Sequence, residues 1–308
     1  MRRNNGNMAT SMVSALWVLS WLLAGCSSDG SSGSSGELRV DLSGEEASVQ
    51  GYPVGTGEDQ IAFEDGFTLQ FDKVLVSLER FELRSSDGSA ANLDADPVVA
   101  DLHLGEPEAW VFDGVPSRRW DDVRFMIAPT TADSRAVDEV ASEDLQAMID
   151  GGYSMWITGT ASDGSETYPF DLRFSDLRVL SDACQNGVDE TDGLVVPNNS
   201  IVNAQVTIHL DHLFFDTFAT DEARLRFEPW AAAAEGDGII TLEDLETQRL
   251  ADLRDRNGDP LLDGGGNPVV YDPGPLLLPA NNLREYVHAA ATTMGHFNGE
   301  GHCDYMQQ

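Results

Sequence analysis

Residues 66–89, "GFTLQFDKVLVSLERFELRSSDGS", decide the class of fold. Apolar side chains take alternate positions in this stretch, first Phe67, Leu69 and Phe71 and then Val74, Val76 and Leu78. A period of two residues that ends in a turn such as "SSDGS" is typical of strands with one buried face. The stretch therefore predicts β-strands that cover a hydrophobic core.

The neighbouring segments extend this β pattern. "VVADLHL", "AWVFDGV" and "DDVRFMIAP" are further short apolar runs that Gly and Pro separate. After a short helix predicted at "SEDLQAMIDGG" (142–152), the segments "SMWITGT" and "YPFDLRF" predict a hairpin. "IVNAQVTIHL" predicts one more strand, up to about residue 210. We therefore expect a mainly β fold, an antiparallel β-sandwich.

The strands "FDKVLVSLERFEL" and "DDVRFMIAP" resemble those of prealbumin-type or immunoglobulin-type β-sandwich domains, which many bacterial surface lipoproteins carry. The resemblance implies such a sandwich, and the later strands extend it over residues 37–215. Residues 216–308 show helical patterns instead, the longest being "NNLREYVHAAATTMG", with Gly295 as its expected end. We expect these residues to form a helical subregion that packs on the sandwich.

Residues 1–26 have the pattern of a secretory signal: Arg2 and Arg3, an apolar run to Leu23, and the ending "LAGC". This ending resembles the lipobox of bacterial lipoproteins, which implies cleavage before Cys26, lipidation of Cys26 and attachment to a membrane through the lipid. An ordinary cleaved signal with an incidental cysteine is the alternative. Residues 27–36, "SSDGSSGSSG", predict a flexible tether. The expected location is the bacterial cell envelope, at the outer membrane or cell surface rather than free in the periplasm.

The charge of the chain excludes nucleic acid as a partner. The sequence has 53 acidic and 18 basic residues, for a formal net charge of -35, and such a surface repels phosphate backbones. The acidity indicates either solubility or an attraction for cations. It identifies no protein or glycan partner.

Two cysteines remain once Cys26 is assigned to a lipid, Cys184 and Cys303. Outside the cytoplasm such a pair usually forms a disulfide. Two free thiols or two soft metal ligands are the alternatives.

Histidines and acids gather in two segments. "VTIHLDHLFFD" (206–216) holds His209, Asp211 and His212, and "MGHFNGEGHCDY" (294–305) holds His296 and His302. If the strand before His209 stops and a helix capped by Asp211 follows, both rings of the first pair can turn toward one point. The expected disulfide would bring the second segment close. Four imidazoles, or three with a carboxylate, suit zinc or copper; histidines with only structural roles are the alternative.

"AAEGDGIITLED" (233–244) resembles an EF-hand calcium loop. With Gly238 at the sharp turn, the resemblance implies four possible calcium ligands, Glu235, Asp237, Thr241 and Asp244. The first ligand position holds Ala233, and the twelfth holds Asp where the motif has Glu. A turn kept only for its geometry, with Thr241 and Asp244 as a capping box for the next helix, is the alternative.

No catalytic motif appears: the sequence lacks G-x-S-x-G, H-E-x-x-H, a P-loop and C-x-x-C. We therefore expect a non-catalytic, membrane-anchored lipoprotein that binds a divalent metal. The alternative is a cell-surface binding or adhesion module with a structural or weak calcium site. The "IHLDHLFFD", EF-hand-like and "GHFNGEGHC" segments together resemble those of uncharacterised bacterial surface lipoproteins.

Overall fold

The structure is a computed structural model that describes residues 33–57, 60–91, 93–220, 222–234 and 238–307. Ser34–Gln308 form one compact unit. The predicted signal peptide, the lipidation residue Cys26 and most of the predicted tether lie outside the described residues. The fold is mainly β, as the sequence predicts, with 40% strand against 16% helix.

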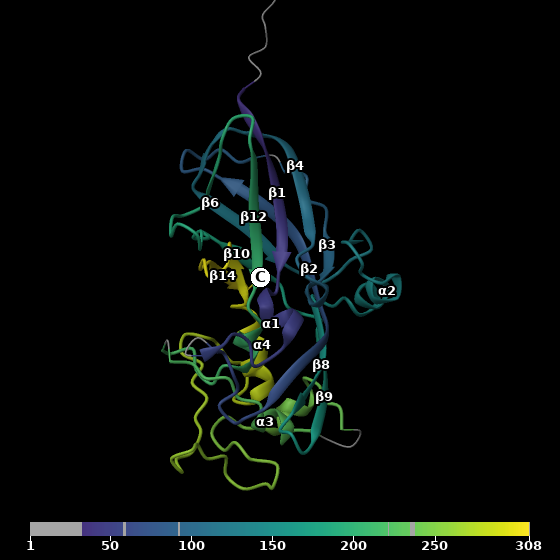
Figure 1. Cartoon of the computed structure of the whole chain (residues 1–308), viewed down its shortest axis with the longest axis vertical. Helices are drawn as coiled ribbons and strands as arrows, with labels where there is room; N and C mark the ends of the chain where they lie inside the picture. Colours follow the sequence, from purple (N-terminus) through teal and green to yellow (C-terminus); the bar gives the residue numbers. More distant parts are fainter. Residues whose placement is uncertain (1–32, 58–59, 92, 221, 235–237, 308) are drawn as a thin grey trace, which may run out of the picture. The chain divides into compact units, whose positions relative to one another are not determined.

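Two larger sheets build the unit (Figure 1). The four-stranded sheet has the order β13-β12-β1-β4, with bounds Gly295–Phe297, Ile201–Ile208, Ser35–Ser43 and Glu108–Pro116. The eight-stranded sheet contains β14 (Asp304–Gln307), β10 (Val179–Asp182), β6 (Asp122–Ile127), β2 (Thr68–Arg84), β3 (Val98–Asp101), β7 (Arg135–Ala136), β8 (Met155–Ser162) and β9 (Thr167–Phe174). A separate pair joins β5 (Arg118–Trp120) to β11 (Leu194–Val196).

The stretch that predicts the fold forms the long central strand β2, which pairs with β3, β6 and β8. Its buried positions change phase between Phe71 and Val74. The register with β8 shifts between Phe71 and Lys73, and one extra residue in a bulge turns the following side chains, Val74 to Leu78, to the other face. A second shift, in the register with β6 between Leu78 and Arg80, precedes Phe81 and Leu83, which return to the first phase. The bulges therefore explain why the sequence alternates in blocks.

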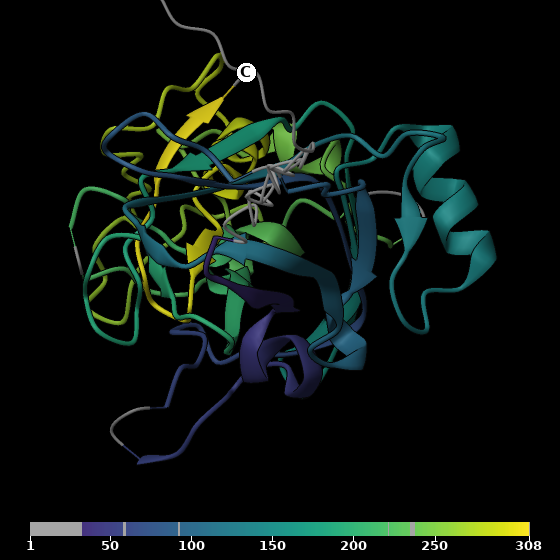
Figure 2. The same ribbon diagram turned by 90° about the horizontal axis from the view of Figure 1, so that it is seen from above.

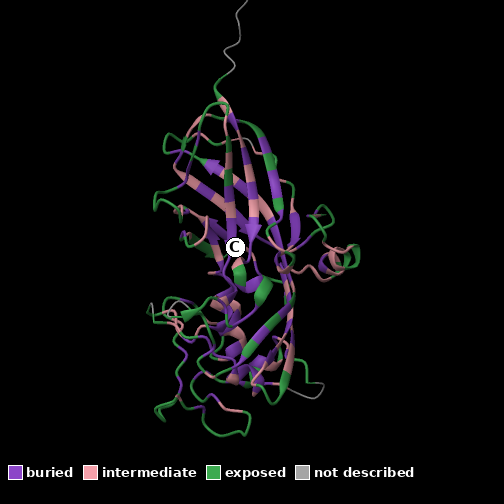
Figure 3. Cartoon of the chain, in the orientation of Figure 1, coloured by how far each residue is buried: buried purple, intermediate pink, exposed green. Residues whose placement is uncertain are grey.

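Both sheets contribute to one hydrophobic core, which includes Val40 of β1, Val76 of β2 and Phe125 of β6. Figure 3 shows the alternation of buried and less buried residues along the strands. A small second cluster covers the other face of β2, where Leu75 packs with Met148. Met148 belongs to α2 (Ser142–Gly151), the helix predicted in this place, which lies to one side of the strands in Figure 1 and Figure 2.

The prediction of a purely antiparallel arrangement is wrong at two strand pairs. β1 runs parallel to β12, and β3 runs parallel to β7. No hairpin joins the members of either pair, so turn geometry does not impose an antiparallel direction on them. The sheets are mixed.

The described helices are short: α1 (Glu45–Gln50), α3 (Glu228–Ala231) and α4 (Leu283–Ala291) accompany α2, with 3₁₀-helices η2 (Leu102–Leu104), η3 (Leu210–Phe214) and η4 (Asp244–Thr247). None of the helices in the described ranges has the length and apolar character that crossing a membrane requires. The segment predicted as a helical subregion holds α3, η4 and α4. It also supplies β13 and β14, one strand for each large sheet.

The predicted end of α4 at Gly295 is wrong, because the helix stops at Ala291. The hydroxyls of Thr292 and Thr293 donate to the carbonyls of Ala289 and Ala290, and the chain then enters β13. Gly295 serves close packing instead. A Cβ at this position would lie 2.7 Å from Ser181 Oγ.

The predicted disulfide between Cys184 and Cys303 is confirmed. Next to it, β14 pairs with β10, and Gln185 N donates to His302 O at 2.8 Å. Covalent and hydrogen bonds therefore attach the C-terminal segment to the eight-stranded sheet.

We expect removal of this disulfide to lower the free energy of unfolding. The bridged residues are 119 positions apart, and closing a loop of that length is worth about 4 to 5 kcal/mol in the chain-entropy model. The test is urea denaturation of Cys184→Ser/Cys303→Ser against the parent chain, both carrying Cys26→Ser. A loss that stays below about 1 kcal/mol would contradict a stabilising role.

Candidate metal centre

Three histidines come together where β12 ends. β12 stops at Ile208, His209 is the N-cap of η3, and His212 lies inside η3. Residues three apart in a 3₁₀-helix are eclipsed, so the rings of His209 and His212 turn to the same side. The predicted change from strand to helix is present, but the predicted cap is wrong: His209 takes that position and Asp211 lies in the first turn.

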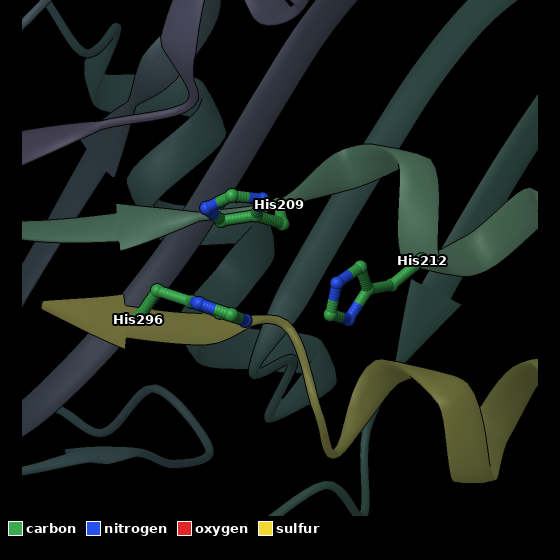
Figure 4. A group of neighbouring side chains, drawn as sticks. All are labelled: His209, His212 and His296. Carbon is green, nitrogen blue, oxygen red and sulfur yellow. The ribbon is translucent and has the colours of Figure 1, made fainter. Parts of the chain in front are cut away.

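The third histidine comes from the neighbouring strand. His296 is the middle residue of β13, in register with Thr207 of β12, and His209 N donates to Met294 O at 2.9 Å. In Figure 4 the rings of His209 and His296 lie one above the other, and the ring of His212 points toward them. The sequence prediction that the C-terminal segment returns to the first histidine pair is therefore correct for His296.

The three rings are close enough to share one ion. Ring centroids are 4.1 Å apart for His209 and His296, 5.3 Å for His212 and His296, and 5.6 Å for His209 and His212. One nitrogen of each ring lies within 4.8 Å of the other two. Nitrogens that bind the same zinc ion are each about 2 Å from it, hence at most about 4 Å apart. The nitrogens are therefore at most about 0.8 Å farther apart than this limit.

Burial keeps the imidazoles of His212 and His296 neutral. His209 and His296 are each 5% exposed, and His212 is half-buried. Burial, together with the nearby rings, lowers the pKa of His212 well below its usual value. Burial lowers the pKa of His296 to about 3, with a smaller contribution from His209 and His302. A neutral imidazole has the free lone pair that binds a metal. The rings of His212 and His296 can therefore bind a metal at neutral pH without first losing a proton.

A hydrogen-bond relay fixes which nitrogen of His212 is free. The hydroxyl of Thr293 donates its only proton to Ala290 O at 2.8 Å. The contact of 2.8 Å between His212 Nδ1 and Thr293 Oγ1 must then have Nδ1–H as the donor. Nε2 of His212 is left unprotonated. Such an outer hydrogen bond is the usual way in which a metal-binding histidine is oriented.

The ring of His296 also contains a buried polar atom that makes no hydrogen bond. Its Nδ1 is buried and has no hydrogen-bond partner among the described residues. A buried polar atom without a partner costs about 1 to 3 kcal/mol. A bound ion is one way to satisfy a ring nitrogen in such a place.

Carboxylates surround His209. Asp211 Oδ1 lies 3.9 Å from its Nδ1, and Glu45 Oε1 lies 3.8 Å from its Nε2. Glu45 and Glu300 form a second group with His209 whose ligand atoms are within 4.8 Å of one another. Burial raises the pKa of Asp211 and of Glu45. These acids place negative charge next to the three rings, which favours a cation there.

Of the five predicted transition-metal ligands, three form one group and two lie beside it. His209, His212 and His296 form one group. Asp211 lies beside His209, and the exposed His302 has its ring 5.3 Å from that of His296, but neither joins the three-residue group. Two further acids beside His209, Glu45 and Glu300, were not predicted from the sequence. Glu300 lies within the "GHFNGEGHC" segment, whereas nothing in the sequence connects Glu45 with it.

The predicted calcium loop is described only in part, because Glu235 and Asp237 lie outside the described residues. Thr241 N donates to Asp244 Oδ2 at 2.8 Å, and Asp244 N donates to Thr241 Oγ1 at 3.4 Å. These reciprocal bonds have the pattern of a capping box, but they lie in the turn before η4, whose N-cap is Glu243. The helix that precedes the loop, α3, has four residues. Calcium binding stays a prediction.

Comparison with protein-family models, with curated proteins and with solved structures finds no match to this chain. The resemblance to bacterial surface lipoproteins stays a prediction.

We expect His296 to make the stability of the metal-free protein depend on pH. Its pKa is about 3 in the folded protein against 6.5 for an ordinary histidine. Between these values the unfolded chain binds more protons than the folded one, so lowering the pH from 6.5 toward 3 lowers the free energy of unfolding.

The measurement is urea denaturation with a chelator present, at several pH values, for the parent protein and for His296→Gln. Glutamine does not titrate, and all carboxylates are common to both proteins. As the pH falls through this range, the free energy of unfolding of the parent protein should therefore decrease relative to that of His296→Gln. A difference that does not vary with pH would rule out a depressed pKa at His296.

Proposed function

We propose that this protein is a non-catalytic metal-binding protein that holds a zinc or copper ion through His209, His212 and His296. The observation that carries the proposal is the convergence of three buried or half-buried imidazoles whose ligand nitrogens lie within 4.8 Å of one another. The relay from His212 through Thr293 to Ala290 supports it, since it leaves Nε2 of His212 free. Asp211 Oδ1, 3.9 Å from Nδ1 of His209, adds negative charge beside the ring.

The donor set favours this class of metal. Imidazole nitrogen suits zinc and copper, whereas magnesium and calcium prefer oxygen ligands. The thiols of Cys184 and Cys303 are used in a disulfide, so neither supplies a thiolate. Divalent copper binds such nitrogen sites more tightly than zinc does. The metal carried in the cell then depends on supply as well as on affinity.

Elemental analysis of the purified protein tests the proposal. We expect an equimolar amount of zinc or copper in the parent protein and its loss in His209→Ala, His212→Ala and His296→Ala, because two imidazoles alone bind weakly. His288→Ala is the matched control, since the Nε2 of His288 bonds to Asp176 and the residue is not part of the group. Equal metal content in all five proteins, or none in the parent, would refute the proposal.

A second prediction concerns the outer hydrogen bond. Thr293→Val keeps the shape of the side chain and removes the oxygen that receives the proton of His212 Nδ1. Loss of such a bond typically weakens metal affinity by about 10- to 100-fold. A competition titration with a chromophoric chelator measures the affinity.

Thr292→Val is the matched control for this experiment. Its hydroxyl also donates to a helix carbonyl, Ala289 O, but the structure shows it no contact with the histidine rings. Metal affinity should stay the same in Thr292→Val. Equal weakening in both variants would mean that the effect comes from the end of α4 and not from the relay.

We further propose that the protein is a lipid-anchored protein of the bacterial cell envelope, attached through Cys26. The "LAGC" ending and the polar segment after it support this location. The disulfide is consistent with an oxidising compartment. Mass spectrometry of the N-terminal peptide tests the proposal, and an unmodified Cys26 in the mature protein would refute it.

The alternative function is a cell-surface binding or adhesion module with a structural or weak calcium site. A prealbumin- or immunoglobulin-like sandwich would suit that role, and the common core of the two larger sheets supports a sandwich. This alternative predicts no stoichiometric zinc or copper. The elemental analysis therefore separates the two functions.

A further inference from the structure

A pocket of about 360 Å³ lies against the three-histidine group. Two of the three histidines, His212 and His296, contribute to its wall. The other lining residues include Phe215, Phe218, Thr220 and His302. Its volume is at the lower end of the range for small-molecule sites, about 300 to 1,000 Å³.

The lining of this pocket differs in charge from the rest of the protein. The chain has 53 acidic residues, but among the residues that the structure describes, none of those that line the pocket is Asp or Glu. A separate pocket, lined by Glu45, Tyr52 and Asp211 among others, does contain carboxylates. The pocket at the histidines is therefore the more favourable place for a ligand with negative charge.

One wall of the pocket is aromatic and adjoins a histidine ring. Phe215 lies 5.0 Å from the ring of His212, and Phe218 lies 5.8 Å from Phe215. The exposed His302 lies near the ring of His296. A neutral imidazole has one N–H group, which can donate to an oxygen of an anionic ligand. Apolar surface and hydrogen-bond donors thus occur together in the pocket.

Three protein donors leave one position of a tetrahedral ion open. In the described part of the chain, no fourth His, Cys, Asp or Glu belongs to the group of His209, His212 and His296. An ion held by His212 and His296 lies beside the pocket, because both residues form its wall. A molecule in the pocket can therefore reach the open position.

We infer that this pocket takes a small carboxylate with an aromatic body, whose carboxylate oxygen occupies the fourth position of the metal. The inference rests on the proposed metal binding and adds to it the class of ligand. The ring of such a ligand packs against Phe215 and Phe218, and His302 donates to its second oxygen. The pocket is large enough for a benzoate-sized molecule.

The experiment uses the full chain loaded with Cu²⁺, which binds nitrogen sites most tightly among the common divalent metals and whose visible absorption responds to a new ligand. Benzoate and azide are titrated separately. Azide is an anion that binds copper without an aromatic body, so it reports the open position alone. We expect both anions to change the copper absorption of the parent protein.

The decisive variant is Thr220→Trp, which fills the pocket from an exposed lining residue. The matched control is Thr167→Trp, an exposed position on β9 that is not among the lining residues. We expect Thr220→Trp to keep its copper but to bind benzoate at least about tenfold more weakly, with azide changed less. Thr167→Trp should behave as the parent protein does.

Each of the other outcomes contradicts a different part of the inference. Stoichiometric copper with no response to either anion means a closed coordination sphere, and the proposed function stands. A response to azide but not to benzoate, or equal benzoate binding in Thr220→Trp, means that the pocket does not select the aromatic body. A parent protein without bound copper refutes the proposed function and this inference together.

Discussion

The pairing of β13 with β12 is the contact on which the rest of the site depends. The two strands share only three residue pairs, but side chains reinforce them. Gln205 N donates to Asn298 Oδ1 at 2.7 Å, and Gly299 N donates to Thr207 Oγ1 at 3.0 Å. These bonds hold the backbone that carries His296 beside the end of β12. Without them the three imidazoles would belong to two unrelated loops.

The C-terminal segment is also held from the other side. β14 joins the eight-stranded sheet, and the disulfide attaches Cys303 to Cys184. The approach is close, since a Cβ on Gly301 would lie 2.1 Å from Gln185 O. His296 is thereby fixed between a strand of one sheet and a crosslink to the other. A site built on two fixed elements keeps its geometry better than one built on free loops.

The sequence predicts the local parts of this structure well. Alternation gives β2 and the hairpin of β8 and β9, and acids in the first turn with glycines at the end give α2, because these signals act over a few neighbouring residues. The histidine spacing and the two cysteines predict the return of the C-terminal segment. The parallel pairing of β1 with β12 is not visible in the sequence, since no local pattern records which distant strands become neighbours.

The same limit applies to the site. Glu45 reaches His209 only because β1 lies next to β12, so its place follows from the sheet order and not from any motif. His302 has the expected residue type and spacing, yet its side chain is exposed while His296 is buried. Backbone register decides which of two nearby histidines faces inward. Spacing alone does not distinguish them.

The strand order has a consequence for when the site can form. During synthesis, β12 with His209 and His212 precedes β13 by the whole segment that contains α3, η4 and α4. A partly made chain therefore offers two imidazoles and the nearby acids, but not the third ring. A metal ion met at that stage gains little from the incomplete set of donors. The ion is therefore bound late, after β13 has paired with β12.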